Sequence, residues 1–255
     1  MCTPYTGLAF SFAETLCEIE YMRAAASKFI TATSKEGVIR DWRQDLRNFQ
    51  TNPGNGTHQW RIPENRPIET DWNEGQSELD GNGPNLRGRL SCTWAIRIEN
   101  YRGKKADRRV FVLDGLASIT VRIMQRTPDG EEGEASRWHF DVANATAPGC
   151  HFHAQVSGVQ AGGADLSIPR LPSLVVTPMD ALEFMLAELF QRAWLDYSSR
   201  ETKEIKSWSP YPRKRLSNLL AWQHSIVMKE SSGAPWTAIK HSKPSRYMIA
   251  PELTP

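Results

Sequence analysis

The feature that most constrains the fold is an alternation of polar and apolar residues along residues 89–99, in which Ala95 is the one exception. A period of two places successive side chains on opposite faces of a β-strand, so one face of this strand is expected to be buried and the other wet. The apolar members are Leu90, Cys92, Trp94, Ile96 and Ile98. Runs of similar character follow at residues 110–113, 119–124, 137–142 and 152–156. These runs predict a four- to five-stranded antiparallel meander over residues 87–157.

Helices are expected on both sides of this meander, because apolar residues recur there at steps of three and four. The N-terminal helices are predicted within residues 8–50, at about 8–33 and 36–50. The C-terminal helices are predicted within residues 177–230, where Thr177 is a suitable N-cap, Pro178 a suitable first residue and Asp180 a partner for a capping box.

The remaining segments carry turn-forming residues. Residues 51–86 are dense in Gly, Pro and Asn and predict a long loop, with a short edge strand near His58–Ile62. Residues 231–255 predict an irregular tail. The whole pattern indicates one α+β domain, residues 1–255, in which helices from both ends of the chain pack on one face of the sheet.

The order of a helix, a four-strand meander and further helices is similar to that of ubiquitin-conjugating and RWD-type folds. A conjugating enzyme needs a nucleophilic cysteine beyond the fourth strand, and no cysteine follows Cys150. The resemblance therefore implies a non-catalytic protein.

Composition indicates a globular chain that is expected to be cytoplasmic. No stretch has the apolar length of a membrane helix, the N-terminus does not resemble a signal peptide, and the four cysteines form no CxxC pair. Nine tryptophans suggest a well-filled core or a contact surface. Residues 201–255 hold nine Lys and Arg against four Asp and Glu, which is compatible with an acidic partner or with a solvated face.

The stretch RWHFDVANATAPGCHFHAQV, residues 137–156, offers the first candidate site. Burial of Trp138, Phe140 and Phe152 on one face would leave the odd-numbered residues together on the other face. With a turn centred near Thr146, His139 is expected opposite His153 and Asp141 opposite His151.

Three interpretations of this face remain open. His139, Asp141, His151 and His153 could hold a divalent metal such as zinc and activate a water molecule. Arg97, Arg122, Arg137 and Gln155 could instead bind phosphate, nucleic acid or an acidic protein segment. The third interpretation is a solvated face, with Asp141 paired to a neighbour. Cys150 beside His151 could serve as a nucleophile or be structural.

The basic residues Arg213, Lys214 and Arg215 form a second candidate, because they occupy the start of a predicted helix, where the helix dipole disfavours cations. A binding role and simple exposure both account for them. From these features we expect a non-enzymatic interaction or adaptor protein of a cytoplasmic complex, with a protein partner and no membrane, and no cofactor is predicted. The alternative is a metal-dependent hydrolase or nuclease that uses the His/Asp cluster.

Overall fold

The computed structural model describes residues 7–54, 56–78, 82–100, 109–127, 129–143, 150–158, 171–229 and 234–254. Its central feature is an antiparallel sheet in which four long strands follow one another in chain order. These strands are β4 (Leu86–Asn100), β5 (Arg109–Arg126), β6 (Glu132–Val142) and β7 (Phe152–Gly158). The predicted meander is therefore present.

The sheet is larger than the predicted four to five strands. Four short strands extend it: β1 (Ala9–Ser11), β2 (His58–Ile62), β3 (Ile68–Glu69) and β8 (Leu171–Pro172). Both β2 and β3 pair with β4, whereas β1 pairs with β5 and β8 with β7. Hydropathy did not indicate β1, β3 or β8, because strands of two or three residues are too short to show a period.

The alternation along β4 has the predicted consequence. Leu90, Cys92, Trp94 and Ile96 are buried, and the side chains between them face the opposite side of the sheet. That opposite side, which carries Arg89, Ser91 and Thr93 of β4 and the residues paired with them on β5, β6 and β7, is called the polar face below.

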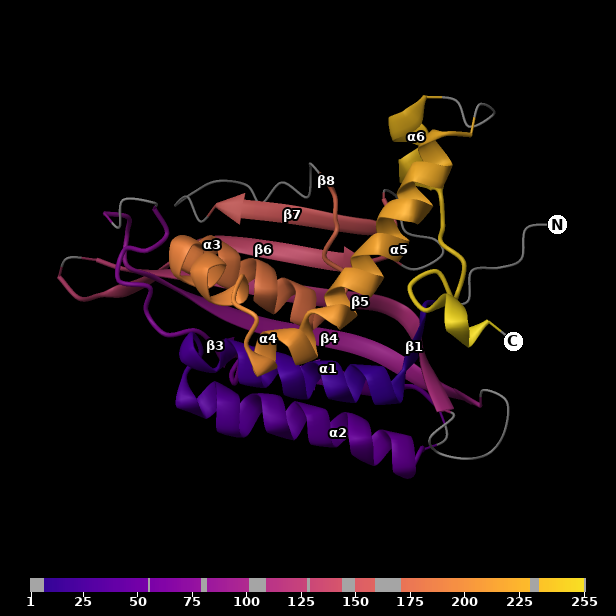
Figure 1. Cartoon of the computed structure of the whole chain (residues 1–255), viewed down its shortest axis with the longest axis horizontal. Coiled ribbons are helices and arrows are strands. Elements are labelled where there is room, and N and C mark those ends of the chain that lie inside the picture. The colour runs from indigo at the N-terminus through magenta and orange to yellow at the C-terminus, as the bar shows by residue number, and fades with distance from the viewer. Residues whose placement is uncertain are drawn as a thin grey trace.

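Helices cover the other side of the sheet. Figure 1 shows α1 (Phe12–Ala25), α2 (Ile39–Thr51), α3 (Pro178–Ser198), α4 (Lys203–Trp208) and α5 (Pro210–Val227) in front of the strands. The helix α3 approaches β4 closely, because a Cβ at Gly88 would lie 2.2 Å from the sulfur of Met185. No helix in the described ranges has the length and apolar character needed to cross a membrane.

The N-terminal helix is shorter than predicted. Residues 9–11 pair with β5 rather than entering the helix, and the hydroxyl of Ser11 accepts a hydrogen bond from the backbone N–H of Glu14. The second helix is close to its predicted range, with a π-helical turn at Ser34–Val38 before α2. At residues 9–11, pairing with β5 therefore replaces the helix that the local apolar pattern predicted.

The segment 51–86 contains the predicted strand β2 but is more ordered than a loop. Asn73 is fully buried, and its amide group donates to the carbonyl of Leu189 and accepts from the N–H of Leu86. This side chain fastens the segment to α3 on one side and to β4 on the other.

The C-terminal region begins as predicted, with Thr177 and Asp180 forming the capping box of α3. The tail is not wholly irregular, because it contains α6 (Pro235–His241), which lies beside α5 (Figure 1). The tryptophans belong mainly to the core: Trp42 and Trp60 stack at 4.2 Å, and Trp94, Trp194 and Trp208 are also buried.

A buried ion cluster joins three of the helices. The guanidinium of Arg215 in α5 donates to Glu18 of α1, at 3.0 Å and 2.5 Å, and to Asp180 of α3, at 2.9 Å. The same Asp180 carboxylate accepts from the backbone N–H of Thr177 at 2.9 Å. Removing one partner of a buried ion pair leaves the other charge uncompensated, which is costly.

We therefore expect Arg215→Ala to lower the free energy of unfolding by about 3–5 kcal/mol. The matched control is Lys214→Ala, because Lys214 makes only half-exposed ion pairs, with Glu14 and Glu252. Its cost is expected to be about 1 kcal/mol or less. Urea unfolding of both variants measures the difference, and equal costs would show that the cluster does not hold the helices together.

Candidate functional site

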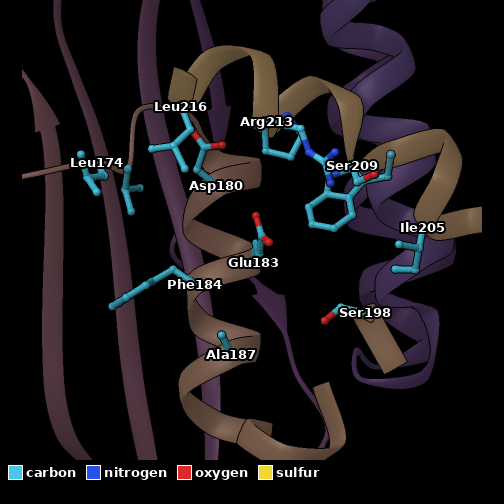
Figure 2. A pocket seen from close by; sticks show the side chains of 13 residues that line it. Leu174, Asp180, Glu183, Phe184, Ala187, Ser198, Ile205, Ser209, Arg213 and Leu216 are labelled. Atoms are coloured by element: carbon cyan, nitrogen blue, oxygen red, sulfur yellow. The ribbon is translucent and has the colours of Figure 1, made fainter. Parts of the chain in front are cut away.

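A cavity lies between α3, α4 and α5. It has a volume of about 530 Å³, within the range of small-ligand and peptide side-chain pockets. We call it the α3–α5 groove. Figure 2 shows its lining side chains, which come from these helices and from the segment before α3. Its apolar wall includes Leu174, Phe184, Ile205, Trp208 and Leu216.

The wall of the groove combines buried core residues, Ile205 and Trp208, with apolar residues outside the core. The core side of α3 presents Leu182, Met185 and Leu189, whereas Phe184 lies on another side and is 40% exposed. Its ring meets those of Trp138 and Phe140 edge-on, at 5.5 Å and 5.8 Å between centroids. The helix is therefore apolar on more than its core side.

Glu183 is the carboxylate inside this apolar wall, and Figure 2 shows it in the space between α3 and the facing helices. Burial raises its pKa from about 4.5 to about 7, and the negative charge of Asp180 adds to the shift, while Arg215 opposes it. Within the described part of the chain Glu183 has no hydrogen bond or ion pair. Glu183 is thus a partly buried carboxyl without a partner, set in a largely apolar wall.

The three basic residues predicted at the start of α5 lie in three different environments. Arg215 is buried in the ion cluster, and Lys214 bridges Glu14 and Glu252. Only Arg213 lines the α3–α5 groove, and none of the described carboxylates pairs with it. Neither a shared binding role nor simple exposure describes all three.

The polar face shows the predicted parity but a different register. His139 pairs with Gln155 and Asp141 with His153, whereas His153 was expected opposite His139 and His151 opposite Asp141. A shift of two residues keeps every side chain on its face, so burial could not distinguish the two registers. His151 lies just before β7 and is buried, with its ring edge-on to Phe152.

The histidines and the aspartate form separate hydrogen bonds. His153 contacts Asp141 at 3.4 Å through Nε2 and the carbonyl of Cys150 at 3.0 Å through Nδ1, while His139 contacts the hydroxyl of Thr120. Burial alone would raise the pKa of Asp141, but hydrogen bonds with His153 and Ser118 lower it. No three His, Cys, Asp or Glu side chains among the residues described are placed to hold a metal ion. The metal interpretation therefore gains no support.

The arginines of the polar face are neutralised by glutamates. Arg97 pairs with Glu99 at 2.7 Å, and Arg137 pairs with Glu134 at 2.7 Å. Arg122 pairs with Glu64, which comes from the segment 51–86. An anion that binds this face would have to break these pairs. Cys150 is buried, and burial raises the pKa of its thiol, which disfavours a nucleophilic thiolate.

No protein-family model, curated protein or solved structure matches this chain. The similarity to ubiquitin-conjugating and RWD-type folds therefore stays at the level of element order. The groove was missed in the sequence because its parts lie far apart in the chain. One signal was available: Phe184, Leu216 and Leu220 add apolar residues outside the core sides of their helices.

The raised pKa of Glu183 makes its effect on stability depend on pH. The carboxyl ionises near pH 4.5 in the unfolded chain but near pH 7 in the folded one, so stability is lost as the pH rises between these values. We expect Glu183→Gln to raise the free energy of unfolding by about 1–2 kcal/mol at pH 8 and to change it little at pH 4. Glu188→Gln, on the exposed side of α3, should have little effect at either pH. An equal effect of Glu183→Gln at both pH values would contradict the assignment.

His151 has the opposite pH dependence. Burial lowers its pKa to about 3, and Lys243 and His153 add to the shift. The unfolded chain takes up a proton below about pH 6.5 while the folded chain does not, so stability is lost as the pH falls. We expect His151→Gln to remove about 1–2 kcal/mol of the stability loss between pH 7 and pH 5. His139→Gln is the control, and chemical denaturation at both pH values is the measurement. An unchanged pH dependence in His151→Gln would show that this ring is not held neutral.

Proposed function

We propose that this protein is a non-enzymatic interaction protein that binds a segment of a partner protein in the α3–α5 groove. The observation that carries the proposal is an apolar groove of about 530 Å³ that remains open between three helices. Its rim continues into exposed leucines: Leu174 is 48% exposed and Leu220, one helical turn beyond Leu216, is 46% exposed. Apolar surface that is contiguous in this way is typical of sites that another molecule covers.

The occupant we propose is a protein segment with an apolar face. A helical or extended segment places side chains into a groove at regular steps, and the groove is bounded by helices whose exposed leucines stand one turn apart. We place this partner in a multi-protein complex of the cytoplasm. The free thiols of Cys17, Cys92 and Cys150 accord with a reducing compartment.

The charge balance of the polar face favours a protein partner over a nucleic acid. Its arginines are already paired with glutamates, so it offers little attraction to a nucleic acid. The groove, in contrast, combines unburied apolar surface with an unpaired carboxyl.

Peptides selected from a random displayed library on the wild-type protein test the proposal. We expect enriched peptides to lose at least about tenfold in affinity for Leu216→Asp, because a charge in the apolar wall must be desolvated when the groove is filled. Leu195→Asp is the matched control, since Leu195 is exposed on α3 but does not line the groove.

Binding that survives Leu216→Asp and is lost in Leu195→Asp would move the partner to another surface. A library that yields no enriched sequence would also contradict the proposal. Circular dichroism of both variants establishes that each remains folded.

A further inference from the structure

We propose that the segment bound in the α3–α5 groove carries a cationic side chain, a lysine or an arginine, whose charged group pairs with Glu183. This inference rests on the proposed function and specifies the chemistry of the partner. It follows from the distribution of charge around the groove.

The ionisable groups around Glu183 are short of positive charge. Three carboxyl groups lie together, those of Glu18, Asp180 and Glu183, and a single buried guanidinium, that of Arg215, serves them. The guanidinium of Arg215 is already divided between Glu18 and Asp180, through hydrogen bonds on both of its edges. Glu183 thus receives no hydrogen bond from this guanidinium, whose positive charge offsets the raised pKa of Glu183 only in part.

Burial makes this shortage of positive charge more unfavourable, because it disfavours the ionised form of a carboxyl group. It raises the pKa of Glu18, although Arg215 opposes the shift, and it raises the pKa of Glu183 to about 7. Among the described lining residues the cation is Arg213, which is exposed and makes no ion pair with another described residue. A cation delivered into the groove would meet a carboxyl that is already desolvated, where a charge-assisted hydrogen bond is strong.

The geometry agrees with a cation attached to an apolar stem. In Figure 2, Glu183 lies on the side of α3 that faces Ile205 and Ser209, whereas Phe184 points to the other side of the helix. A long basic side chain buries its methylene groups on apolar surface while its charged end reaches a carboxylate. Ile205 and Trp208, which line the groove from α4, provide apolar surface of that kind across from Glu183.

Three small probes of similar shape test the inference: 2-phenylethylamine, which is cationic, 2-phenylethanol, which is neutral, and phenylacetate, which is anionic. Their dissociation constants are measured by protein-observed NMR at pH 8 and pH 5. We expect the amine to bind at least about fivefold more tightly than the alcohol at pH 8, where Glu183 is ionised, and this ratio to approach one at pH 5, where it is protonated.

Glu183→Gln should remove the preference for the amine over the alcohol at pH 8, because the amide carries no charge. Glu188→Gln, the same substitution on the exposed side of α3, should keep the preference. Loss of the preference in Glu183→Gln alone assigns the cation to this carboxyl.

The contrary outcomes separate the two proposals. Equal binding of amine and alcohol at pH 8 overturns the cationic partner and leaves the groove as a binding site. Tighter binding of phenylacetate also overturns it, since Arg213 would then be the charged group that selects the partner. If none of the probes shifts resonances of the groove residues, the groove itself, and with it the proposed function, is overturned.

Discussion

The guanidinium of Arg215 is the interaction on which the rest of the structure depends. It is buried between Glu18 of α1 and Asp180 of α3, so it joins the first helix of the chain to two helices that follow the sheet. Asp180 also caps α3 by accepting from the backbone before it, which orients the start of that helix. Because a buried charge must be paired, the three helices can pack on the sheet only in an arrangement that brings these groups together.

This arrangement has a consequence for the surface. Arg215 directs its hydrogen bonds to Glu18 and Asp180 and makes none to Glu183, one turn further along α3. The same packing holds α4 and α5 away from the outer side of α3, which leaves the groove open beside that carboxyl. The buried ion cluster therefore has two effects. Its ion pairs hold the helices together, and they leave the carboxyl of Glu183 unpaired in the apolar wall of the groove.

Local sequence patterns were sufficient for the faces of the strands and the start of α3, but not for relations between distant residues. Alternation placed Phe140 inside and His139 outside, and Thr177 with Asp180 identified a helix start. The register of β6 and β7 was wrong by two residues, because both registers bury the same side chains. The ion cluster of Arg215 could not be predicted from the sequence for a different reason. Its carboxylates lie 197 and 35 residues away from Arg215, and no periodicity connects them.

The ionisation of Glu183 tests the account most directly, because its midpoint reports the lack of an ion-pair partner without any ligand. The measurement is an NMR titration of the side-chain carboxyl carbon of Glu183 in the folded protein, assigned by its disappearance in Glu183→Gln. The account predicts a midpoint near pH 7, well above that of an ordinary glutamate. A midpoint near pH 4.5 would show that the carboxyl is solvated or already paired, and would contradict the account.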